Sequence, residues 1–173
     1  MRDGRKGGPD KTLAAVCGLY CEACTLYIAT MEDPARLKKL ANRFGLSEQE
    51  MKCYGCRAEK RGPYCHTLCK MFDCAAEKGV DFCSECPDYP CDQLKKFQTE
   101  APHRIDLWDD LDFIRQKGWE QWIARVREKF SCPECGAINS AYDLSCRICV
   151  SKPGSAYVSK HEKAVEAAAK NMR

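Results

Sequence analysis

Residues 132–149, CPECGAINSAYDLSCRIC, contain two Cys-x-x-Cys pairs separated by ten residues. Two residues between cysteines let both sulfurs reach one ion, and two such pairs supply the four thiolates of a tetrahedral Zn²⁺ site. Gly136, directly after the first pair, permits a backbone turn that points amides at the sulfurs. We therefore predict a zinc-ribbon module over residues 132–150. Its predicted metal ligands are Cys132, Cys135, Cys146 and Cys149.

The whole chain is rich in cysteine and poor in large apolar side chains. It has 15 Cys among 173 residues but only 29 Val, Ile, Leu and Phe, and a net charge of +3. Such a sequence lacks both the apolar content of a self-sufficient core and the high net charge of a disordered chain. Structural zinc contributes about 10–16 kcal/mol per site in finger peptides, so metal binding can supply the missing stability.

Disulfide bonding is the rival explanation for so many cysteines. The basic N-terminus is followed by no apolar signal segment, the cysteine count is odd, and close Cys-x-x-Cys spacing suits a metal ion better. No apolar run is long enough to span a membrane. We expect a cytoplasmic protein without membrane contact, whose cysteines bind metal.

Eleven cysteines precede the ribbon, and loop-closure cost favours ligands that are close in sequence. One predicted four-thiolate site consists of Cys53, Cys56, Cys65 and Cys69. A second consists of Cys74, Cys83, Cys86 and Cys91. A crossed scheme, in which Cys21 and Cys24 share an ion with Cys53 and Cys56, remains an open alternative.

Local grouping leaves the triplet Cys17, Cys21 and Cys24. Three protein ligands with an open fourth position distinguish catalytic metal sites from structural ones. The triplet could form another zinc site, completed by His66, His103 or a carboxylate. Its spacing also suits a [4Fe–4S] cluster, as in radical S-adenosylmethionine enzymes, although this strand-poor chain cannot build their barrel. The alternative function is thus an iron–sulfur redox or sensor protein.

Helix signals dominate the rest of the sequence. Asp33-Pro34 and Gly45 mark the start and end of one helix, and Ser47 with Glu50 forms a capping box for a short one. Periodic apolar positions predict further helices over residues 67–78, 90–101, 105–117 and 119–130. We predict a mainly α fold, a small metal-stapled helical domain with irregular cysteine-rich loops and a C-terminal zinc ribbon.

Four regions follow from these patterns. They are a disordered basic lead (1–11), a cysteine-rich helical metal-binding domain (12–131), the zinc ribbon (132–150) and a basic, partly helical tail (151–173). The tail is Ala-rich, which suggests a loosely attached helix. Residues 12–150 contain 19 basic and 21 acidic side chains, so the body is not a basic nucleic-acid-binding surface.

Catalytic motifs are missing from the sequence. None of its three histidines lies in a metalloprotease motif, and no nucleophile elbow, phosphate loop or dinucleotide fingerprint occurs. The sequence therefore favours a non-enzymatic protein whose metal sites are mainly structural. We expect its ribbon to contact an unidentified protein or nucleic acid, with Arg57, Tyr142 and Arg147 as exposed contact residues.

The order of the cysteine motifs resembles a known family. The motifs are Cys17-Gly-Leu-Tyr-Cys21-Glu-Ala-Cys24, Cys53-Tyr-Gly-Cys56 and Cys83-Ser-Glu-Cys86-Pro-Asp-Tyr-Pro-Cys91. They resemble the bacterial and archaeal domain of unknown function 3795, which implies a cysteine-rich, zinc-binding protein with no assigned activity. The ribbon resembles the Ran-binding-protein type of zinc finger, with Phe130 where that family has Trp, and is equally similar to a generic short zinc ribbon.

Overall fold

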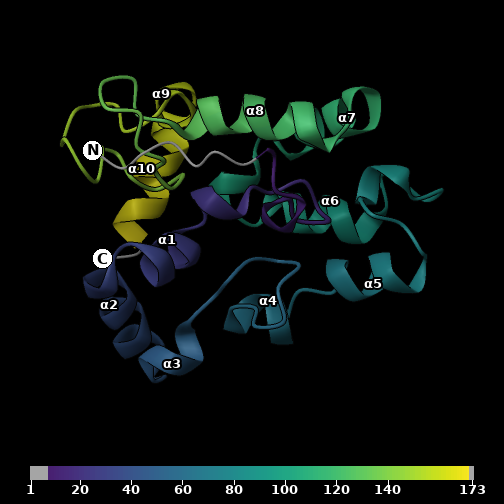
Figure 1. Cartoon of the computed structure of the whole chain (residues 1–173), viewed down its shortest axis with the longest axis horizontal. Helices are drawn as coiled ribbons and strands as arrows, with labels where there is room; N and C mark the ends of the chain where they lie inside the picture. Colours follow the sequence, from purple (N-terminus) through teal and green to yellow (C-terminus); the bar gives the residue numbers. More distant parts are fainter. Residues whose placement is uncertain (1–7, 172–173) are drawn as a thin grey trace.

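The computed structural model describes residues 8–171, so most of the predicted disordered lead, residues 1–7, and residues 172–173 lie outside the described residues. Within that range the prediction of a mainly α fold is confirmed (Figure 1). The described residues contain no strand, only isolated antiparallel bridges at Ala14–Tyr20 and Ser131–Ile138. None of their helices combines the length and apolar character needed to cross a membrane.

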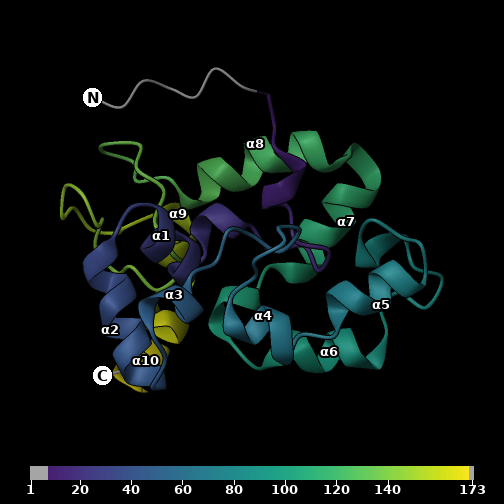
Figure 2. The same cartoon turned by 60° about the horizontal axis from the view of Figure 1, so that its bottom comes forward.

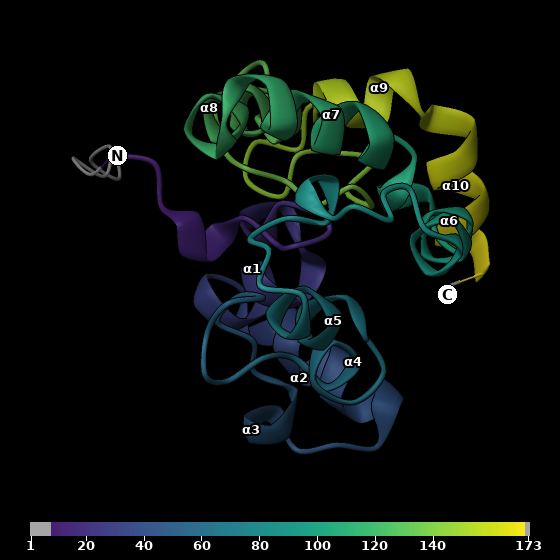
Figure 3. The same ribbon diagram turned by 90° about the vertical axis from the view of Figure 1, so that its right-hand side faces the viewer.

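The helices follow one another with short connections. The α-helices are α1 (Thr25–Met31), α2 (Pro34–Phe44), α3 (Glu48–Met51), α4 (Pro63–Thr67), α5 (Met71–Glu77), α6 (Asp92–Thr99), α7 (Leu107–Lys117), α8 (Trp119–Phe130), α9 (Ala156–Lys160) and α10 (Glu162–Asn171). Four short 3₁₀ turns are η1 (Lys11–Leu13), η2 (Cys21–Ala23), η3 (Cys83–Glu85) and η4 (Pro102–Arg104). In Figure 3, α7, α8 and α9 form an upper layer over α1–α5.

The main core lies between the α7–α8 hairpin and the N-terminal segment. Leu111 and Trp122 are fully buried there, and Tyr20 meets the Trp122 ring edge-on at 6.0 Å. Gly18 has φ +80°, and a Cβ at this position would lie 2.8 Å from Leu111 Cγ, so the N-terminal turn needs glycine. A second, smaller cluster joins α1, α2 and α3. The apolar core is therefore divided and thin, as the composition indicates.

Local helix signals predict most helix boundaries. Asp33 caps α2 through the Arg36 amide, and Gly45 ends it with φ 65°. The Ser47–Glu50 capping box starts α3. The helix predicted over residues 105–117 begins two residues later, at Leu107, because Pro102 opens the 3₁₀ turn η4 just before it.

The helix predicted over residues 67–78 is confirmed over α5, Met71–Glu77, but residues 68–70 are not helical. The amides of Leu68 and Cys69 both donate to Tyr64 O, at 2.9 and 3.0 Å, which closes α4 after about one turn. The chain starts again as α5 at Met71. Leu68, in the break between α4 and α5, is 67% exposed.

The C-terminal region is helical as predicted, but its predicted loose attachment is wrong. Tyr157 and Val165 are fully buried in the main core, and the Tyr157 ring stacks on Phe130 at 4.8 Å. Lys160 Nζ and His161 Nε2 both lie 2.9 Å from Asp106 Oδ1 at the start of α7. Apolar burial and these polar contacts fix α9 and α10 against the body.

Candidate metal centres

The four ribbon cysteines lie together in the structure. Cys132 Sγ lies 3.6 Å from Cys149 Sγ, and Cys135 Sγ lies 3.6 Å from Cys146 Sγ. All four sulfurs lie within 4.8 Å of one another, and no other set of three or more potential ligands in residues 8–171 is as compact. Four Zn–S bonds of about 2.3 Å in a tetrahedron place sulfurs about 3.8 Å apart, so the set fits a single ion of that size.

Two backbone turns bring these sulfurs together. Gly136 follows the first Cys-x-x-Cys pair with φ 73°, as predicted, and Val150 follows the second with φ 65°. The Ile148 amide lies 3.4 Å from Cys146 Sγ, in position to donate to a thiolate. A hydrogen bond from Ser151 lowers the pKa of Cys132 to about 6, which favours the thiolate that a metal requires.

Asn139 connects the two turns and is fully buried. Its Nδ2 donates to Gly154 O at 2.8 Å and to Ala137 O at 3.0 Å. Its Oδ1 accepts from the Arg147 amide at 2.9 Å. The Asn139 side chain therefore holds the residues that follow the first turn against those that begin the second turn.

Ion pairs attach the ribbon to the helical body. Arg147 Nη2 lies 2.5 Å from Glu32 Oε2 at the end of α1, beside which Figure 2 shows the ribbon loops. Arg36 on α2 forms a second pair with Asp143, at 3.0 Å. The ribbon is thus held against α1 and α2.

Arg57, Tyr142 and Arg147, the predicted contact residues, form hydrogen bonds within the protein. Their prediction as exposed contacts is therefore wrong. The Arg147 side chain is only 11% exposed, because it bridges Glu32 and the Ile138 carbonyl. Arg57 donates to Ala14 O and Asp81 O, and Tyr142 bonds His103 Nδ1 at 2.6 Å.

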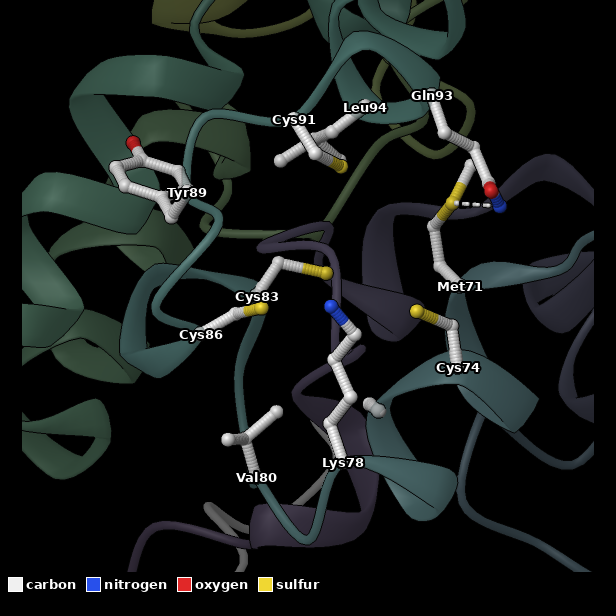
Figure 4. A pocket seen from close by; sticks show the side chains of 11 residues that line it. Met71, Cys74, Lys78, Val80, Cys83, Cys86, Tyr89, Cys91, Gln93 and Leu94 are labelled. Atoms are coloured by element: carbon white, nitrogen blue, oxygen red, sulfur yellow. Dashed lines mark hydrogen bonds between the residues drawn. The ribbon is translucent and has the colours of Figure 1, made fainter.

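Four more cysteines line one cavity of about 40 Å³, shown in Figure 4. They are Cys74, Cys83, Cys86 and Cys91. Cys74 comes from α5, Cys83 opens η3, and the other two follow before α6. The Lys78 ammonium points toward the sulfurs in Figure 4, and it donates a hydrogen bond to Asp88. The cavity has room for an ion, and the sulfurs would have to draw closer to bind one.

The remaining seven cysteines come from two regions that the fold brings together. They are Cys17, Cys21, Cys24, Cys53, Cys56, Cys65 and Cys69. The Cys56 amide lies 3.3 Å from Cys21 Sγ, which joins the triplet to the set predicted as separate. Burial raises the pKa of the Cys65 thiol, and its neighbour Cys24 is the first of four thiols that raise it further. The triplet and the Cys53–Cys69 set share one neighbourhood.

The histidines are poor candidates for the fourth ligand of a metal ion at Cys17, Cys21 and Cys24. His103 Nδ1 bonds Tyr142, and its Nε2 accepts from Arg104 Nε at 3.2 Å, so both ring nitrogens are engaged. Burial lowers the pKa of His103 to about 4 and keeps the ring neutral. The prediction of His103 as a metal ligand is therefore wrong. His66 is exposed on α4.

Two residues near the cysteines were not identified from the sequence. Ser151, two residues after the last cysteine, could have been found from that closeness in sequence. Lys78 carries no local signal, because its partner Asp88 becomes a neighbour only when the loops fold.

Comparison with known proteins identifies one match. Residues 13–96 match the model of a family described as a protein of unknown function, DUF3795. The match includes all eleven cysteines before the ribbon and supports the resemblance of that region. The ribbon lies outside it, so its resemblance to the Ran-binding-protein finger stays a prediction. No curated protein and no solved structure matches the chain.

Proposed function

We propose that this chain is a zinc-binding protein with several thiolate sites, which mainly stabilise the fold and present an interaction surface. The observation that carries this proposal is the compact ribbon set, with its four sulfurs within 4.8 Å. Two observations support further metal sites. The residues that match the family model are rich in cysteine, and four thiols line one cavity. We assign this set a structural role because four thiolates complete the coordination of a tetrahedral ion and leave no open position.

Energetics support the structural role. The core is divided into two clusters, and buried thiols such as Cys17 have a raised pKa, because burial disfavours their charged form. A bound cation offsets that cost and makes binding free energy a part of folding free energy. All fifteen cysteines are free, which agrees with our proposal of a reducing compartment such as the cytoplasm.

The interaction surface that we propose lies at the tip of the second ribbon turn. Ile148 is 61% and Val150 75% exposed there, and only Cys149 separates them in the chain. Exposed apolar side chains on a rigid turn fit a protein partner better than a phosphate backbone.

The test is metal analysis of protein purified without oxygen. We expect zinc without iron, no visible colour, and loss of helical circular dichroism when a strong chelator is added. Cys135→Ser should lose one zinc, since Cys135 is exposed and its change removes a ligand without opening the core. Iron with broad visible absorbance would instead support the iron–sulfur alternative at Cys17, Cys21 and Cys24.

A further inference from the structure

The four ribbon sulfurs form two close pairs, and each pair joins one turn of the ribbon to the other. Cys132 Sγ in the first turn lies 3.6 Å from Cys149 Sγ in the second. Cys135 Sγ in the first turn lies 3.6 Å from Cys146 Sγ in the second. Ser151 Oγ, at 3.2 Å from Cys132 Sγ and 3.1 Å from Cys149 Sγ, contacts both sulfurs of one pair. A disulfide bond is about 2.05 Å long, so modest side-chain rotations bring either pair into bonding range.

Each pair combines one exposed cysteine with one buried cysteine. Cys135 and Cys149 are exposed, whereas Cys132 and Cys146 are each only 2% exposed. The residues directly before and after each exposed cysteine are exposed as well. Figure 1 shows the ribbon loops at the edge of the molecule. A small oxidant in solution can therefore reach one cysteine of each pair, while the other cysteine lies behind it.

Metal binding keeps the sulfurs in the form that reacts with oxidants. A metal-bound cysteine is a thiolate, and thiolate character together with exposure determines how readily a cysteine is oxidised. Hydrogen peroxide is small and uncharged, so it can approach the exposed Cys135 and Cys149. The buried partner, 3.6 Å away, is then in position to attack the oxidised sulfur. An exposed thiolate beside a resolving cysteine is the arrangement found in redox-sensitive proteins.

We propose that the ribbon is a site of reversible oxidation, at which hydrogen peroxide converts its four thiolates into two disulfides and releases the metal ion. The two disulfides are Cys132–Cys149 and Cys135–Cys146. This inference rests on the zinc binding proposed above and adds the regulation of the ribbon site. A small thiol reductant can reverse the change, because one sulfur of each disulfide belongs to an exposed cysteine.

Each disulfide consumes one molecule of hydrogen peroxide. The exposed thiolate attacks a peroxide oxygen, the O–O bond breaks, and the sulfur becomes a sulfenic acid while hydroxide leaves. The buried thiolate then attacks this sulfur, the S–O bond breaks, and a second hydroxide leaves. The two sulfurs together lose two electrons, peroxide gains them, and two protons from solvent convert the hydroxides to water. Each disulfide removes two of the four ligands, so the metal ion is released.

The proposed disulfides connect the two turns, as a bound metal ion would. Disulfides within the two Cys-x-x-Cys motifs would leave the turns without a covalent connection. The oxidised ribbon should therefore stay closed after the metal has left. Asn139 would still connect it to Gly154, just before α9. Oxidation would thus release zinc without detaching α9.

The test uses the full zinc-loaded chain and hydrogen peroxide. A colorimetric zinc indicator should report release of the ion that Cys135→Ser lacks. Digestion without reductant by trypsin and glutamyl endopeptidase cuts after Arg147 and after Glu134. The peptide of residues 135–147 should then contain an internal disulfide, and residues 130–134 should be linked to the peptide that begins at Ile148. The same digest of protein kept with reductant, the control, should contain neither disulfide.

Two matched variants test the pairing. Cys146→Ser removes the partner of Cys135, so dimedone should trap Cys135 as a sulfenic acid. Cys132→Ser removes the partner of Cys149, which dimedone should trap instead. In each variant the pair that stays complete should still form its disulfide. Trapping of Cys149 in Cys146→Ser, and of Cys135 in Cys132→Ser, would overturn the proposed pairing.

The outcomes separate this proposal from the function on which it rests. Ribbon zinc that peroxide does not release, or disulfides within the Cys-x-x-Cys motifs, overturns the oxidation site alone. Proteolysis between the ribbon and α9 that is as fast in oxidised protein as in reduced, chelated protein also overturns it. Protein that holds no ribbon zinc before peroxide is added overturns the proposed metal binding, and with it the release of zinc on oxidation.

Discussion

Val150 occupies the backbone position that Gly136 occupies in the first ribbon turn, but with a β-branched side chain. Its φ of 65° is close to the 73° of Gly136. The left-handed region costs a non-glycine residue roughly 1–2 kcal/mol, and more for a β-branched one. Since its side chain is 75% exposed, no packing compensates the strain.

We expect Val150→Gly to stabilise the zinc-loaded protein by about 1 kcal/mol, because relief of strain exceeds the added entropy of the unfolded chain. Urea unfolding at neutral pH measures the change. Gly136→Val introduces the opposite change in the matching turn and should destabilise the protein. A loss of stability in Val150→Gly would contradict the strain argument.

Lys78 offers a second test at a single residue. Its ammonium bonds Asp88 and points toward the sulfurs of the four-thiol cavity, and Asp88 and then Cys86 raise the pKa of Lys78. Donors to metal-bound thiolates typically change metal affinity 10–100-fold when they are removed. We expect Lys78→Met to weaken zinc binding at this cavity about tenfold in chelator competition. Lys95→Met, which removes an exposed charge paired with Asp92, is the control and should leave affinity unchanged.

At the scale of elements, a polar cluster joins three helices. Asp106 precedes α7 and meets Lys160 of α9, His161 and, at 3.5 Å, Lys129 of α8. Burial alone would raise the pKa of Asp106, but these hydrogen bonds and charges lower it overall. Because the folded pKa lies below the unfolded value, the carboxylate stabilises the fold at neutral pH. That contribution is lost as pH falls from about 4 through the folded pKa.

Asp106→Asn should therefore destabilise the protein by about 2 kcal/mol at pH 7, because it removes a buried carboxylate that accepts a hydrogen bond from Lys160 and lies 3.5 Å from Lys129. Asp109→Asn makes the same charge change at an exposed position of α7 and should have little effect. Thermal unfolding at several pH values measures both. Equal stability loss in the two variants would show that the Asp106 cluster is not what attaches α9.

At the scale of the whole molecule, we expect metal removal to unfold different parts of the chain one after another. The ribbon separates α8 from α9, and Asn139 connects it to Gly154 just before α9. We expect chelation to release α9 and α10 first, so that limited proteolysis cuts after residue 150 before the α7–α8 hairpin is lost. Mass spectrometry of the fragments checks this. Simultaneous cleavage throughout the chain would mean that the ribbon and the body unfold as one unit.

The sequence predicts whatever depends on neighbours along the chain. Local signals predict the caps of α2 and α3, the two helices of the α7–α8 hairpin and the paired cysteines of the ribbon, and the structure contains each of them. Tertiary contacts decide the rest. The apolar period of residues 68–75 suits one helix, yet Tyr64 O closes α4 early. The burial of Tyr157 and the convergence of Cys21 with Cys56 join segments far apart in sequence, which no local pattern records.

One feature of the core bears on how the chain is made. Leu13, near one end of the described residues, and Val165, near the other, belong to the same buried cluster. The core can therefore close only after the chain has been synthesised as far as Val165. Until then the N-terminal thiols would stay open to oxidants, and the metal binding that we propose would protect them only afterwards.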